Sequence, residues 1–151
     1  MEKGRLSLLR ASIKAQGTEI ERIFERIEER RRGKGEANLE SLAYQLHNLY
    51  CAFEDLMKIV ADFFENHIDD SAHYHSALLW RMKMPIEGVR PALLSETSYK
   101  LLESLRAFRH VFRHAYSYEL DPKKLALVVE DALKLRRLYQ GDIDRFLGQL
   151  Q

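Results

Sequence analysis

Residues 39–66 read LESLAYQLHNLYCAFEDLMKIVADFFEN, and their pattern indicates the fold class. Its apolar side chains recur every three or four residues, which is the spacing of one face of an α-helix. The positions on this face are Leu42, Leu46, Leu49, Phe53, Leu56, Val60 and Phe63. We therefore predict a long helix over residues 39–66 that forms the centre of the hydrophobic core.

The chain on either side carries the same helical spacing, and no segment shows the sustained two-residue alternation of a β-strand. A first helix is expected over about residues 6–31, with Gly17 as a weak point and a break at residues 30–35. A shorter helix over residues 74–83 should end before Pro85, because proline disrupts the interior of a helix. These segments indicate helices on both sides of the central one.

Two further helix starts follow from capping residues. Ser95 is suited to the N-cap of a fourth helix, and Asp121 followed by Pro122 is a favourable cap and first-turn pair for a last helix running towards Phe146. The sequence therefore predicts an all-α fold, a bundle of about four or five helices, formed as a single domain over residues 1–151.

Composition limits the classes of protein that fit. The 151 residues are 46% hydrophobic, which is enough for one core, and the formal net charge is only +1. Attraction to nucleic acid must then come from local clusters, which argues against a protein that coats duplexes nonspecifically. Cys51 is the only cysteine, so an intrachain disulfide is excluded, and we expect it to be a buried structural thiol. With no signal peptide and no apolar run of roughly 20 residues, we expect a cytoplasmic protein.

Residues 106–116 read RAFRHVFRHAY and place three arginines and two histidines in one expected helix. Arg106, His110 and Arg113 lie opposite the apolar stripe of that helix. The stripe consists of Leu101, Leu105, Phe108, Phe112 and Ala115. A basic face separate from the core contact indicates a helix able to bind phosphate groups.

Within this segment, Arg109 and His114 are separated by four residues, and Tyr116 follows two residues later. This Arg-x4-His-x-Tyr pattern on a late helix resembles the HEPN superfamily, in particular its HepT-like ribonuclease toxins. The upstream residues that share the resemblance are Leu46, His47, Asn48, Leu49, Tyr50, Glu54, Tyr74, His75, Leu78, Leu79 and Met82. The resemblance covers residues 39–150. It departs from the family at His110, where a small polar residue such as asparagine often stands.

The resemblance implies an endoribonuclease that cleaves single-stranded RNA without a metal or other cofactor. It assigns general acid and base chemistry to His114, and binding and stabilisation of the reacting phosphate to Arg109. Products would carry a 2′,3′-cyclic phosphate and a 5′-hydroxyl. Arg106, His110 and Arg113 are candidates for contacts with the RNA backbone.

Helical geometry has a consequence for this site. Five residues at about 100° each place Arg109 and His114 roughly 140° apart around an undistorted helix, so one helix does not easily aim both at one phosphate. Two copies related by a twofold axis could line one shared cleft with both pairs. A composite site at a homodimer interface is also what the resemblance implies.

The resemblance further implies a partner, a nucleotidyltransferase antitoxin of the MNT type, as in a type VII-like toxin–antitoxin pair. In that case Tyr116 is the candidate acceptor of AMP, whose phosphate would block RNA beside the arginines. Tyr118 is the less favoured acceptor. The alternative is a noncatalytic HEPN-fold subunit that binds nucleotides or assembles with a nucleotidyltransferase.

Other polar groups have simpler interpretations. The arginines of residues 106–113 could form a solvated face, with His114 making a hydrogen bond at the negative end of the helix dipole. The histidines and aspartates of residues 67–75 lack a recognised metal-ligand spacing, so no metal site is predicted. His47 and Glu54 could border the cleft, but interhelical contacts explain them equally well. The basic run at residues 30–34 is expected to be a solvated turn.

Overall fold

The computed structural model describes residues 2–65, 74–114 and 119–150, and every element in these ranges is an α-helix. The elements are α1 (Lys3–Arg30), α2 (Glu36–Glu65), α3 (Tyr74–Met82), α4 (Glu96–Arg113) and α5 (Pro122–Gly148). The predicted all-α bundle is therefore confirmed. None of the described helices combines the length and apolarity needed to cross a bilayer.

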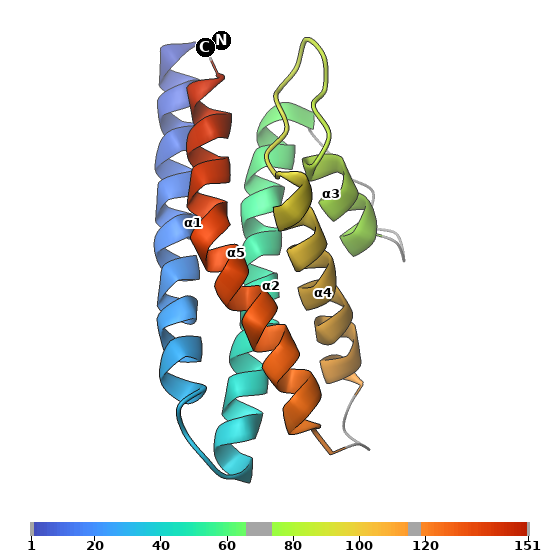
Figure 1. Ribbon diagram of the computed structural model, residues 1–151. Coiled ribbons are helices and arrows are strands. Elements are labelled where there is room, and N and C mark those ends of the chain that lie inside the picture. The colour runs from blue at the N-terminus through green and yellow to red at the C-terminus, as the bar shows by residue number, and fades with distance from the viewer. Residues whose placement is uncertain (1, 66–73, 115–118, 151) are drawn as a thin grey trace.

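Helices α1 and α2 form a long antiparallel hairpin, and the expected break at residues 30–35 is confirmed (Figure 1). The side chain of Asn38 donates from Nδ2 to the carbonyl oxygen of Arg30 at 2.7 Å, which satisfies one free carbonyl at the end of α1. Gly35 has a positive φ of 96°, a conformation that glycine adopts without strain. Helix α1 continues through Gly17, so the weak point expected there does not interrupt it.

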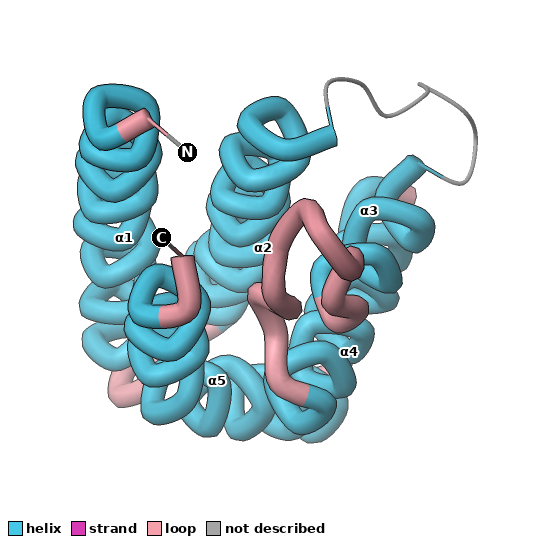
Figure 2. The backbone as a smooth tube through the Cα atoms, turned by 90° about the horizontal axis from the view of Figure 1, so that it is seen from above, coloured by secondary structure: helices cyan, strands magenta, loops and turns pink. Residues whose placement is uncertain are grey.

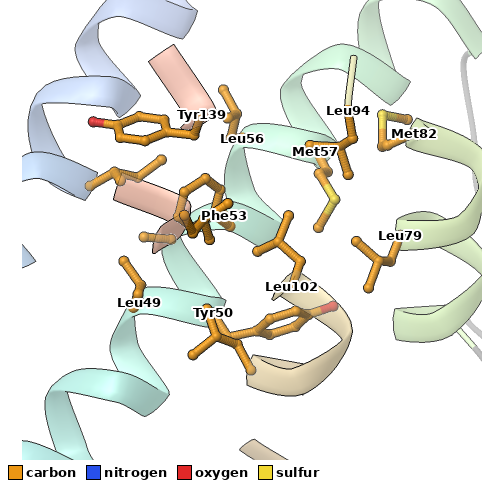
Figure 3. Close-up of a cluster of buried hydrophobic side chains, with 14 of the residues drawn as sticks. Leu49, Tyr50, Phe53, Leu56, Met57, Leu79, Met82, Leu94, Leu102 and Tyr139 are labelled. Carbon is orange, nitrogen blue, oxygen red and sulfur yellow. The ribbon is translucent and has the colours of Figure 1, made fainter. Parts of the chain in front are cut away.

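Helix α2 lies between α1 on one side and α3 with α4 on the other, while α5 crosses the bundle (Figure 1; Figure 2). Three aromatic rings join the long helices. The ring of Phe53 on α2 lies 6.2 Å from that of Phe24 on α1 and 5.4 Å from that of Tyr139 on α5. Figure 3 shows the α2 side chains in the middle of this cluster. The central position predicted for residues 39–66 is thus confirmed.

The other side of α2 packs against α3 and α4, as Figure 3 shows for Met57, Leu79 and Leu102. Leu102 is completely buried, whereas Leu101, which the helical stripe predicts to face inward, is only partly buried. The inward face of α4 is therefore rotated slightly from the predicted one. Its packing against α2 and α5 sets the direction in which the basic residues point.

Both predicted N-caps are present. Ser95 accepts a hydrogen bond from the backbone N–H of Ser98 at 3.2 Å, and its own hydroxyl donates to Asp142 on α5 at 3.1 Å. Asp121 accepts from the backbone N–H of Lys123 at 2.9 Å, and Pro122 begins α5. These caps fix the start of α4 against α5, and they hold the motif helix in place from its N-terminal end.

Candidate functional site

The motif residues gather at the C-terminal end of α4. The helix ends at Arg113, and His114 is its C-cap, with a non-helical φ of −111° and ψ of 12°. Its backbone N–H donates to the carbonyl oxygen of Val111 at 3.1 Å, which tightens the last turn. The angle of roughly 140° expected between Arg109 and His114 assumed an undistorted helix, so it does not apply at His114.

Arg106 differs from the other basic residues because a carboxylate holds it. Its Nη2 lies 3.1 Å from Oε2 of Glu103, and its Nε donates to Oε1 of Glu103 at 3.3 Å. The hydrogen bond to this carboxylate raises the pKa of Arg106 further above its ordinary value. Much of the charge of Arg106 is thus compensated within α4.

Four basic side chains remain, which we call the α4 basic cluster: Arg109, His110, Arg113 and His114. Within the described ranges, none of them forms an ion pair with a carboxylate. His110, Arg113 and His114 are exposed, whereas Arg109 is partly buried and its Nε is fully buried without a hydrogen-bond partner. Uncompensated guanidinium groups close to imidazoles can bind and polarise a phosphate.

The two histidines of the cluster lie against each other. The ring centroids of His110 and His114 are 4.9 Å apart, with an interplanar angle of 60°. His110, which stands where related sequences often have a small polar residue, thus places a second imidazole beside His114.

His47 on α2 contacts the helix that carries the cluster. The spacing of residues in the sequence did not distinguish this contact from an ordinary interhelical one. Its ring centroid is 5.4 Å from that of Phe112 on α4. Burial lowers the pKa of His47, and the guanidinium groups of Arg109 and Arg113 lower it further, against an opposing contribution from Asn48. His47 therefore belongs to the electrostatic surroundings of the cluster.

With this geometry in place, comparison with known proteins identifies the family. A family model described as HepT-like protein matches residues 41–150. The chain belongs to the HepT-like family. This HepT-like protein is thereby placed in the HEPN superfamily, and its helix α1 lies outside the matched range. Searches of curated proteins and of solved structures find no match.

The remaining histidine-rich part of this HepT-like protein is residues 67–75, where a metal site was considered. His75 on α3 contacts the buried carboxylate of Glu54 through its Nδ1, so these two residues make an interhelical contact. No group of three or more potential metal ligands occurs in the described part of the chain. Residues 67–73 of the polar segment lie outside the described residues, as do Ala115, Tyr116 and Tyr118.

An open groove of about 1200 Å³ adjoins the motif end of this HepT-like protein. Phe112 and Arg113 line it together with the α1–α2 turn and the start of α5. Arg30, Arg31, Gly33 and Lys34 of the basic run also line this groove. Arg31 and Arg32 of that run are held by Glu28, at 2.7 and 3.2 Å. The charges of these two arginines are therefore compensated by Glu28, which agrees with the solvated turn expected from the sequence.

Proposed function

We propose that this HepT-like protein is a toxin that cleaves single-stranded RNA without a metal ion. The observation that carries the proposal is the α4 basic cluster, in which Arg109 and His114 have no carboxylate partner among the described residues. A helix end with uncompensated guanidinium and imidazole groups suits an anionic substrate. Membership of the HepT-like family supports a role of this toxin type.

The proposed reaction is an internal phosphoryl transfer. A general base removes the proton of the ribose 2′-hydroxyl, and the 2′-oxygen forms a bond to the adjacent phosphorus. The bond from phosphorus to the 5′-oxygen breaks, and a general acid gives that oxygen a proton. The products are a 2′,3′-cyclic phosphate and a 5′-hydroxyl. His114 supplies the proton transfer, and Arg109 stabilises the charge that develops on the phosphate oxygens.

A homodimer would complete the site. In a twofold dimer, His114 of one protomer would act with Arg109 of the other, so the shared cleft would hold two equivalent pairs. The exposed end of α4 also carries an apolar side chain, Val111, with 60% of its surface exposed between the basic residues. A second copy packed on this end would cover Val111 and bring both clusters together. Arg106, His110 and Arg113 then contact the RNA backbone on either side.

Regulation would follow from a nucleotidyltransferase antitoxin. We propose Tyr116 as the acceptor of AMP, because it follows His114 by two residues and its modification would place phosphate beside the arginines. Incubation with the cognate nucleotidyltransferase and ATP should add the mass of AMP to the peptide that contains Tyr116. A Tyr116→Phe variant should remain unmodified, and absence of added mass from the wild-type protein would refute this part.

The ribonuclease activity is tested with purified protein and a labelled single-stranded RNA in the presence of a chelator. We expect cleavage to fragments with cyclic-phosphate and 5′-hydroxyl ends. A matched oligonucleotide with 2′-deoxyribose throughout should stay intact, because it lacks the attacking hydroxyl. If well-folded protein leaves the RNA intact and binds a nucleotide instead, the protein is a noncatalytic HEPN-fold subunit.

A further inference from the structure

The seam between α2 and α4 contains polar atoms that are buried and unpaired. Among the described residues, four buried side-chain atoms lack a hydrogen-bond partner: Gln45 Oε1, His47 Nδ1, Tyr50 Oη and Arg109 Nε. Three of them lie on α2, and the fourth belongs to the motif arginine on α4. Of these, His47 and Tyr50 are both electrostatic neighbours of Arg109. Because an unpaired buried polar atom is costly, these three residues point to an interaction that forms in the functioning protein.

The unpaired atoms of His47 and Arg109 are complementary. The Nε–H of arginine is a donor and cannot accept. A neutral imidazole with its proton on Nε2 leaves Nδ1 as an acceptor. That tautomer also suits the other side of the ring, because Nε2 lies 3.9 Å from the sulfur of Cys51, within the range of a weak contact. Pairing Arg109 with His47 would satisfy both buried atoms at once.

Tyr50 is the competing acceptor, since its hydroxyl also lies at the seam, as Figure 3 shows for the far end of its ring. Burial raises the pKa of Tyr50, and the charges of Glu54, Arg106 and Glu103 influence it more than that of Arg109. For His47, in contrast, Arg109 is the foremost of the charged neighbours, ahead of Arg113. Arg109 is thus a charged neighbour of both groups, and a Tyr50→Phe variant separates the two acceptors.

The protonation state of His47 fits this role. Burial lowers its pKa from the ordinary 6.5, and the charges of Arg109 and Arg113 lower it further, whereas a side-chain hydrogen bond with Asn48 raises it. The net shift of the pKa is downward, so the neutral, accepting form prevails at neutral pH. The contact between its ring and that of Phe112, at 5.4 Å, holds the imidazole against α4.

We infer that His47 is a positioning residue of the ribonuclease site, which orients the guanidinium of Arg109 towards the reacting phosphate by accepting a hydrogen bond from its Nε–H. The effect of His47 on catalysis rests on the proposed ribonuclease function. The hydrogen bond between His47 and Arg109 does not depend on that function. Fixing Nε leaves both terminal amino groups of Arg109 free for a phosphate, which suits the bidentate geometry of arginine. His47 itself touches neither substrate nor the reacting atoms.

Substitutions separate acceptor chemistry from packing. His47→Leu fills the space of the imidazole with an apolar side chain and removes the acceptor. In His47→Asn, the amide oxygen can take the place of Nδ1 as acceptor. We expect kcat/KM for RNA cleavage to fall roughly tenfold to a hundredfold in His47→Leu, as for loss of a hydrogen bond to a charged group. His47→Asn should recover most of that loss, and the control Tyr50→Phe should cleave at close to the wild-type rate. A purely structural role would instead make losses of activity follow losses of folding stability.

Nuclear magnetic resonance tests the hydrogen bond without any cleavage. In ¹⁵N-labelled wild-type protein, His47 should be the Nε2–H tautomer, with a coupling across the hydrogen bond between its Nδ1 and Nε of Arg109. A proton on Nδ1, or no coupling together with wild-type cleavage by His47→Leu, would overturn the inference. If wild-type protein shows the coupling but cleaves no RNA, the hydrogen bond stands and the proposed function is the part that fails.

Discussion

Arg106 is held by Glu103 on the preceding turn of α4, with Nη2 and Oε2 3.1 Å apart, and its charge is therefore partly compensated. Arg109, three residues later, has no such carboxylate partner among the described residues. We predict that Arg109→Ala lowers kcat by about a hundredfold or more, as for loss of a group that stabilises transition-state charge. Arg106→Ala should mainly weaken RNA binding and raise KM. Steady-state cleavage rates compare the two, and equal losses of kcat would contradict this distinction.

A composite site predicts complementation between inactive variants. If Arg109 of one protomer acts with His114 of the other, a heterodimer of Arg109→Ala and His114→Ala contains one intact site and one doubly defective site. Subunit exchange in an equal mixture should then restore roughly a quarter of wild-type activity. Each variant incubated alone serves as the control. No recovery, with heterodimers verified by mass spectrometry, would mean that both groups act within one protomer.

Helix α1 lies outside the family match, yet its side chains belong to the common core. Phe24 is completely buried, and its ring lies 5.6 Å from that of Tyr139 on α5. We predict that Phe24→Ala lowers the free energy of unfolding by about 3 to 5 kcal/mol, through lost burial and the cavity left behind. Chemical denaturation should show one transition in both proteins, as one domain requires. Separate unfolding of α1 would contradict the single-domain proposal.

His47 makes stability depend on pH. Because its pKa is lowered from 6.5 in the folded protein, the unfolded chain binds a proton at a higher pH than the folded one does. Its contribution to stability is therefore fully present above pH 6.5 and is lost as the pH falls through the lowered value. His47→Asn lacks this titration. The free energy of unfolding of wild type relative to His47→Asn should thus decrease on acidification below pH 6.5, and a constant difference would contradict the shift.

Local sequence signals predicted much of this fold because their physics is local. Ser95 and Asp121 cap helices through their own side chains, and the helical spacing of residues 39–66 marks a central helix whichever neighbours pack on it. The register of α4 was less predictable. Leu101 and Leu102 are adjacent and chemically identical, and only packing against α2 and α5 determines that Leu102 becomes the fully buried one.

Buried charge could not be predicted from the pattern. Arg90 is only 4% exposed, because the carboxylate of Glu65 and carbonyl oxygens from three residues satisfy its guanidinium. These partners lie up to 25 residues away in the chain, so no spacing rule connects them. The same holds for the site, where the sequence indicated Arg109 and His114 but left His47 among ordinary interhelical contacts. The compensation of Arg106 by Glu103 also depends on rotamers.

We propose that His114 carries out metal-independent cleavage of RNA. This role is tested by comparing wild type with His114→Ala on the same labelled single-stranded RNA, with chelator present and folding of both verified by circular dichroism. We predict cyclic-phosphate fragments from the wild type and a loss of at least about a hundredfold in rate for His114→Ala, as for removal of a general acid or base. Equal cleavage by the two proteins, or cleavage that requires added metal, would contradict the account.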